Sequence, residues 1–159
     1  MKTKNVLHSA AMYPRSATVR RMVYHLKVHI LNISQMICRR FIIDGNTHLA
    51  ELHHLIQMIM GWKNQHLHVF HIWGVDYGIA YTGGGYYRDD PCEIHLGDLG
   101  LRAGDKFSYV YDFGDYWQHE VRVEKVENAK LGYRHPICTA GRRACPLEDV
   151  GGPMPTRML

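Results

Sequence analysis

Residues 109–120 read YVYDFGDYWQHE, and the alternation that runs into this stretch and out of it again decides the fold class. Apolar side chains keep the odd positions on both sides of a glycine: Phe107, Tyr109, Tyr111, Phe113, Trp117, Val121 and Val123. The even positions there are mostly polar. Since successive residues of a strand face opposite sides, the stretch predicts a β-hairpin that turns at Gly114–Asp115.

The same residues could instead belong to a catalytic site. Asp112, Asp115 and His119, with Glu148 and Asp149 further along, have the side chains of acid–base catalysis or metal-dependent hydrolysis. The predicted hairpin places Asp112 on the polar face, Asp115 in the turn and His119 on the aromatic face. These positions diverge, so we predict no catalytic residue, and hydrolysis remains an alternative.

Outward from the hairpin, the chain alternates strands with one helix. Residues 22–30 and 37–44 alternate as strands and predict a second hairpin. Residues 47–60 change to a helical period, with Thr47 as the expected N-cap and Gly61 as the terminator. Residues 66–74 predict a strand, 75–93 a long loop and 94–107 a short helical turn that leads into the next strand. The order predicts an α+β fold, β-grasp-like, with one main helix packed on a mixed or antiparallel sheet.

Bulk composition fits one globular domain. The 159 residues are 46% hydrophobic and 21% charged. No apolar run approaches the ~20 residues of a transmembrane helix, so no membrane association is expected. The stretch 1–20 shows no period and predicts a poorly ordered extension ahead of a domain at 21–159. With no signal peptide evident, the four cysteines predict reduced thiols and a cytoplasmic location.

The charge is unevenly distributed along the chain. Eight basic residues precede the first acid, Asp44, whereas the remainder has an excess of acids. A basic arm at 1–20 could bind DNA through counterion release or could be a solvated end.

Two groups of side chains are candidate metal ligands. His66 and His68 lie two residues apart, on one face of a strand, and could bind one ion together with His119 or Asp112. Cys138 and Cys145, with six residues between them, could form a zinc site with a histidine. An edge strand with polar alternate residues and a glycine-rich loop with inert thiols are the structural alternatives. Zinc is therefore the one cofactor considered.

Long segments of the chain also resemble one known family. YHLKVHI, RRFII, LAELHHLIQMIMGWKNQHLHVFHI, LGDLGLRAGDKFSYVYDFGDYWQHEVRVEK and CTAGRRACPLEDVGGP follow in this order over residues 22–153. Together they resemble the plasmid pRiA4b ORF-3-like family. Its matching positions here are His53, Trp62, His66, His68, Asp112, Gly114, Asp115, Trp117, His119, Cys145, Glu148, Asp149, Gly151 and Gly152.

The resemblance implies an α+β domain of bacteria and archaea, found on plasmids and mobile elements, with no established reaction. Three departures stand out. Cys38 occupies a position that is commonly tryptophan, and Val150 one that is usually cysteine. Relatives usually continue beyond Gly-Gly-Pro, so the resemblance implies that this chain is truncated at the C-terminus.

The sequence thus predicts a cytoplasmic binding or interaction module rather than an enzyme, with a protein as its partner. Its candidate functional residues are His53, Trp62, His66, His68, Asp112, Asp115, Trp117, His119, Glu148 and Asp149. An apolar surface is expected around Trp62, Tyr86, Tyr87 and Trp117. The alternatives are a metal-binding protein or metal-dependent hydrolase, and DNA binding through the basic arm.

Overall fold

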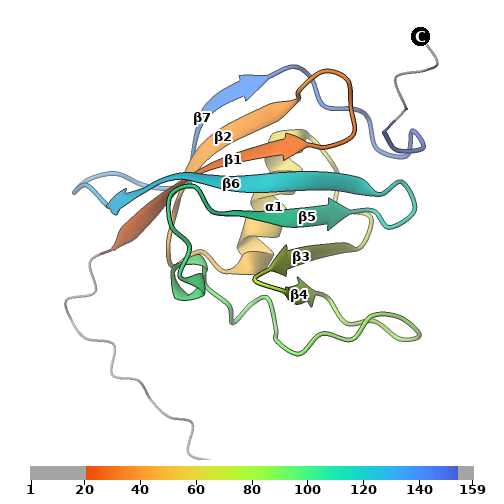
Figure 1. Cartoon of the computed structure of the whole chain (residues 1–159), viewed down its shortest axis with the longest axis horizontal. Coiled ribbons are helices and arrows are strands. Elements are labelled where there is room, and N and C mark those ends of the chain that lie inside the picture. Colours follow the sequence, from red (N-terminus) through yellow and green to blue (C-terminus); the bar gives the residue numbers. More distant parts are fainter. Residues whose placement is uncertain (1–20, 154–159) are drawn as a thin grey trace, which may run out of the picture.

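The computed structural model describes residues 21–153, which form a single seven-stranded sheet covered on one face by one helix (Figure 1). All neighbouring strands are antiparallel, and they follow the order β4-β3-β5-β6-β1-β2-β7. The strands are β1 (Met22–Ile30), β2 (Cys38–Asp44), β3 (His68–Ile72), β4 (Val75–Gly78), β5 (Lys106–Tyr111), β6 (Trp117–Asn128) and β7 (Ile137–Arg142). The α+β class is confirmed and the sheet is antiparallel rather than mixed, whereas the β-grasp label is not confirmed.

The predicted hairpin is β5 and β6, which pair from Lys106↔Arg122 to Tyr111↔Trp117. The expected faces hold along both strands but fail in the turn, because Asp112 takes a left-handed backbone conformation with φ 59°. That rotation breaks the alternation. Asp112 is therefore buried, and Phe113 is exposed. The prediction that Asp112 lies on the polar face was wrong.

The helix α1 (Leu49–Met60) begins one residue later than predicted. His48, not Thr47, is the N-cap: its ring accepts from the Glu51 amide, while the Glu51 carboxylate accepts from the His48 amide. This reciprocal pair is a capping box with histidine in place of serine. Gly61 ends the helix with φ 78°, as predicted.

Two strands at the ends of the sheet were not predicted. β4 lies in the stretch assigned to a long loop, and it pairs with β3 across a turn at Trp73–Gly74. β7 lies in the stretch interpreted as a glycine-rich loop, and it pairs with β2. Both are short, and edge strands lack the strict alternation that burial imposes on central ones. The predicted helical turn is present as a 3-10 helix, Leu96–Leu99.

The hydrophobic core fills the space between α1 and the sheet. Its largest fully buried side chains include Trp117, Tyr109, Tyr111, Phe41 and Phe70. Aromatic rings from β3, β5 and β6 pack against the apolar stripe of the helix. This packing removes apolar surface from water, which is the dominant favourable contribution to the free energy of folding. In the described part of the chain, no helix is long and apolar enough to cross a membrane.

Candidate functional site

Three segments that are distant in the sequence meet at one end of the β5–β6 hairpin. They are residues 61–67 after the helix, the turn 112–116, and the irregular segment 144–153, here called the C-terminal strap. The Trp62 indole donates to the Pro146 carbonyl at 2.9 Å. The Tyr111 hydroxyl donates to Glu148 at 2.6 Å, and the Gly151 amide donates to Asp115 at 2.9 Å. These contacts explain why the strap follows the hairpin turn without regular structure of its own.

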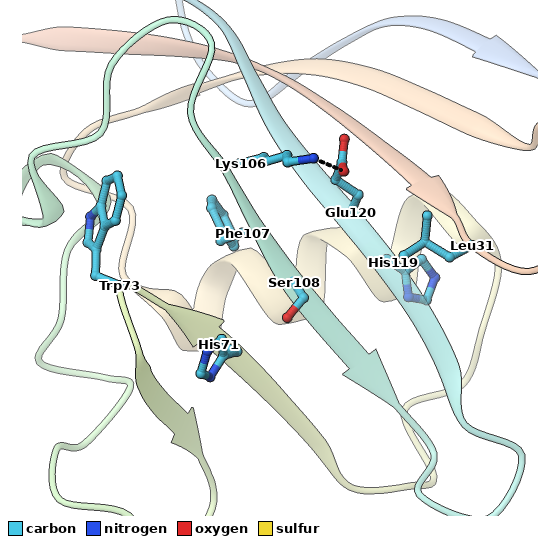
Figure 2. Close-up of a pocket in the computed structure, with 8 residues that line it drawn as sticks. All are labelled: Leu31, His71, Trp73, Lys106, Phe107, Ser108, His119 and Glu120. Carbon is cyan, nitrogen blue, oxygen red and sulfur yellow. Dashed lines mark ion pairs between the residues drawn. The ribbon is translucent and has the colours of Figure 1, made fainter.

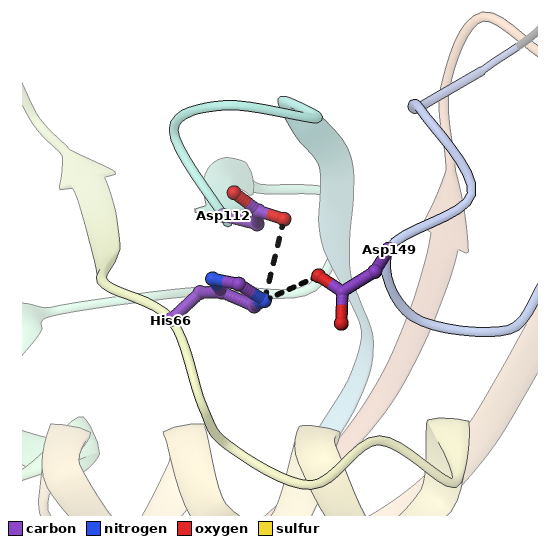
Figure 3. Close-up of side chains that lie close together, drawn as sticks. All are labelled: His66, Asp112 and Asp149. Carbon is purple, nitrogen blue, oxygen red and sulfur yellow. Dashed lines mark hydrogen bonds and ion pairs between the residues drawn. The ribbon is translucent and has the colours of Figure 1, made fainter.

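The strap brings one carboxylate to a histidine and a second carboxylate (Figure 3). His66 Nε2 lies 2.7 Å from Asp149 Oδ1 and 3.7 Å from Asp112 Oδ2. One ligand atom from each residue lies within 4.8 Å of the other two. Within residues 21–153 this is the group of three or more potential ligands that could hold a metal ion.

The metal ligands predicted from the sequence do not come together in this way. His68 is buried at the start of β3, where its ring stacks on His53 with centroids 3.4 Å apart. His119 is fully buried against Tyr109. Of the predicted histidines, His66 alone joins the cluster, because it precedes β3 and its side chain turns toward the strap rather than into the core.

The two predicted cysteine ligands are also separated from that cluster. Cys138 is exposed on β7. Cys145 lies in the strap, 3.2 Å from Arg39 and 3.2 Å from the sulfur of Met60. Burial raises the pKa of the Cys145 thiol, and the nearby Arg39 guanidinium opposes this effect. The thiol therefore packs the strap against Met60 and Arg39.

His53 belongs to a buried polar network between the helix and the sheet. Its Nδ1 lies 2.8 Å from the Tyr109 hydroxyl and its Nε2 lies 2.6 Å from Asn64 Oδ1. The Tyr109 hydroxyl also accepts from Gln57 at 2.9 Å. An amide oxygen only accepts, so Nε2 of His53 carries the proton and Nδ1 accepts from Tyr109. The network therefore gives both ring nitrogens of a neutral His53 a hydrogen-bond partner.

Burial strongly affects the charge state of these histidines. Desolvation lowers the pKa of His53 to about 4, and it lowers the pKa of His119 to about 4.

Trp62 and Trp117 also lie in the core, 5.8 Å apart between ring centroids. The expected apolar surface around these two tryptophans is therefore wrong, although Tyr86 is exposed.

A shallow hollow of about 270 Å³ lies on the sheet face away from α1 (Figure 2). His71, Trp73 and Ser108 border one side, and the Lys106–Glu120 ion pair borders the other. The Trp73 indole donates to the Leu99 carbonyl and His71 lies 2.6 Å from Asp76, so these polar groups are already partnered. Of the polar groups that border the hollow, the Ser108 hydroxyl and the buried Nε2 of His119 have no hydrogen-bond partner among the described residues.

A second hollow, of about 310 Å³, lies between α1 and β7 and is lined mainly by apolar side chains. Leu55, Met58 and Ile59 form the helix side together with the polar Glu51 and His54, whereas Phe41, Pro136 and Cys138 form the sheet side. We call it the α1–β7 groove. The sequence reasoning missed it, although an exposed Met58 on the polar side of an amphipathic helix was a usable signal.

Comparison with known proteins identifies relatives over most of the chain. The family model described as plasmid pRiA4b ORF-3-like protein matches residues 22–158. Uncharacterized protein y4hQ of Sinorhizobium fredii is 34% identical over 132 residues, which cover 82% of this chain and 68% of that protein. The crystal structure of MM3350 from Methanosarcina mazei, a protein of unknown function, superposes with a TM-score of 0.73 at 38% identity. That match covers 83% of this chain and 76% of MM3350.

Proposed function

The chain belongs to the family of plasmid pRiA4b ORF-3-like proteins, and we propose that it acts there as an interaction module that binds an extended, acidic segment of a partner protein along β7. The observation that carries the proposal is an open strand edge beside an apolar groove. Together these two features match the recognition mode in which a peptide adds a strand to a sheet and places alternate side chains in a pocket.

The open edge belongs to β7. This strand is last in the sheet order, and among residues 21–153 its strand partner is β2 alone. Five of its six residues are exposed, and Ile137 is half-buried. The outer backbone groups of such an edge are free to pair with an added strand, about 4.8 Å away.

The α1–β7 groove lies on the helix side of that edge. Cys138 of β7 pairs with Phe41, whose ring packs into the core beneath α1, so Cys138 faces the helix side. Met58, on the opposite wall, is 78% exposed. An added strand would direct every second side chain toward these groups, and apolar side chains there would remove both walls from water.

Charge determines the chemistry of the partner. Residues 129–147, which include β7, contain Lys130, Arg134, Arg142 and Arg143 and no aspartate or glutamate. A segment that alternates acidic and apolar residues would match this edge in charge and the groove in polarity. Charge complementarity of this kind speeds association and excludes basic competitors.

A labelled peptide tests the proposal directly. The probe is acetyl-Glu-Val-Asp-Val-Glu-Val-amide, and its control has lysine at each acidic position. We expect fluorescence anisotropy to report binding of the acidic peptide alone, with slower hydrogen exchange in residues 137–142. Met58→Glu should weaken binding at least about tenfold, which corresponds to about 1.4 kcal/mol. Ile79→Glu, at an exposed site near the opposite edge, should leave it unchanged.

Three outcomes would overturn the proposal. Equal binding of the lysine peptide would remove the charge argument, and an equal effect of the two glutamate substitutions would remove the groove. If the acidic peptide does not bind and sedimentation instead shows dimers that Met58→Glu dissociates, the occupant of the edge is a second copy of this chain.

Several further properties predicted from the sequence remain predictions. DNA binding through the basic arm concerns residues 1–20, which lie outside the described residues. Cytoplasmic location, an association with mobile elements and a hydrolytic activity also stay predictions. The description of the family as plasmid pRiA4b ORF-3-like favours an association with mobile elements.

A further inference from the structure

We propose that His66, Asp112 and Asp149 form a binding site for a divalent transition-metal ion, independent of the β7 edge. One imidazole nitrogen and two carboxylate oxygens are ligands that Zn²⁺, Co²⁺ and Mn²⁺ accept in proteins. Three protein ligands leave coordination positions open for water or a further ligand, which is the pattern of reactive rather than closed structural sites.

The strongest support comes from the Asp112 carboxylate. Its side chain is only 10% exposed, and its two oxygens have different surroundings. Oδ1 accepts from the amides of Gly114 and Asp115, at 2.9 and 3.3 Å. Among the described residues, Oδ2 accepts no hydrogen bond, and it faces His66 Nε2 at 3.7 Å, too far for one.

Oδ2 faces His66 without a hydrogen-bond donor among the described residues, so its lone pairs are available to a cation. The two turn amides hold the other oxygen, so the orientation of the carboxylate is fixed before an ion arrives. Such hydrogen bonds to the non-coordinating atoms of a ligand are typical of metal sites.

The other two ligands come from segments that are held nearby. The amides of Gln65 and His66 donate to the Tyr111 hydroxyl at 3.0 and 3.3 Å, which positions the backbone of His66. Glu148 accepts from that hydroxyl and from the Lys63 amide at 2.8 Å. Asp149 follows it directly. The hydroxyl of Tyr111 therefore links the two segments that present His66 and Asp149.

The distances suit an ion after small adjustments. Metal–ligand bonds of about 2.0–2.2 Å require ligand atoms about 3.0–3.5 Å apart. The separations from His66 Nε2 to the two carboxylates are 2.7 and 3.7 Å, on either side of this range, and the three ligand atoms all lie within 4.8 Å of one another. The side chain of Asp149 is 59% exposed and can rotate, so it can make the adjustment while Asp112 stays fixed.

The alternative is a simple ion pair between a protonated His66 and two carboxylates. The chain contains a matched example, because His71 and Asp76 form an exposed pair at 2.6 Å without a third ligand. A metal site should depend on Asp149 and not on Asp76, whereas adventitious binding to exposed His–Asp pairs should depend on both.

Cobalt provides the test, since the absorption of bound Co²⁺ separates nitrogen and oxygen ligands from thiolates. The full-length protein, reduced and freed of metal, is titrated with Co²⁺ and followed by calorimetry and visible absorption. We expect one equivalent to bind without a thiolate charge-transfer band. Asp149→Asn and His66→Gln should each weaken binding by about ten- to a hundredfold, while Asp76→Asn should not change it.

Circular dichroism of each variant verifies that the fold is retained. Binding with a thiolate band would assign the ion to the cysteines and overturn the proposal. So would the absence of one-equivalent binding, or equal losses in Asp149→Asn and Asp76→Asn. None of these outcomes depends on whether a peptide binds at β7.

Discussion

The Tyr109 hydroxyl and the His53 imidazole share a buried hydrogen bond of 2.8 Å that joins the central strand β5 to the helix above it. Tyr109 is fully buried, so the bond lies within the core rather than at its margin. Gln57 donates to the same hydroxyl, and Asn64 accepts from the other nitrogen of His53. A polar network in this position makes the packing of α1 specific, but it also creates penalties when one partner is lost.

Removing the hydroxyl should therefore destabilise the protein. Tyr109→Phe leaves Nδ1 of His53 and the Gln57 amide without a partner in a dry site, and we expect the free energy of unfolding to fall by about 1–3 kcal/mol. Urea denaturation measures it. Tyr116→Phe, at an exposed position of the turn, is the control and should change stability by less than about 0.5 kcal/mol. A similar loss in both variants would contradict the network.

Lowering the pH should destabilise the fold even at pH values well above the pKa of its carboxylates. His53 and His119 have folded-state pKa values of about 4, compared with about 6.5 in an unfolded chain. Between these values the unfolded chain binds protons that the folded chain does not. The free energy of unfolding should therefore decrease as the pH falls through this window, by up to about 1.4 kcal/mol per pH unit for each group.

Urea denaturation at several pH values between about 7 and 4.5 measures this slope. In His53→Gln, the slope of the free energy of unfolding against pH should be smaller by the contribution of about one proton, whatever the absolute stability of the variant. A free energy of unfolding that is independent of pH over this range would show that the two imidazoles are not neutral in the fold.

The strap should be sensitive to a single methyl group. Gly152 has φ 82°, and a Cβ there would lie 2.3 Å from the Asp115 carbonyl oxygen, so Gly152→Ala cannot keep the present contact. We expect the free energy of unfolding to fall by about 1–3 kcal/mol and proteolysis within residues 144–153 to become faster. Gly132→Ala is the matched control, since Gly132 has φ 86° and open space around it. An effect no larger than that of the control would mean that the strap does not pack closely on the turn.

Substitution of Arg39 should destabilise the protein far more than substitution of its neighbour Arg40. The Arg39 guanidinium donates to the Ile59 carbonyl at the helix C-terminus, at 3.0 Å, and to the Arg143 carbonyl after β7, at 2.9 Å. Arg39→Gln should destabilise the protein by about 2 kcal/mol and loosen β7, as measured by hydrogen exchange. Arg40 pairs with Glu124 at the surface, so Arg40→Gln should cost less than about 1 kcal/mol. Equal losses would refute this assignment.

The sequence by itself determined the elements whose pattern is local. The β5–β6 hairpin follows from a period of two on both sides of Gly114, and α1 follows from its apolar stripe and Gly61. Burial of one face imposes such periods, so central elements can be read from composition and spacing. Family membership was likewise determined, because signature residues are distributed along the whole domain.

Only the tertiary structure decided which polar groups meet. His66 and Asp149 are 83 residues apart, and their contact depends on a strap without regular structure and on the left-handed turn at Asp112. The open edge of β7 likewise became evident only once the sheet order was known. Sequence periodicity records which side of an element is buried, whereas a site depends on how separate elements pack, and packing brings together groups that no spacing along the chain relates.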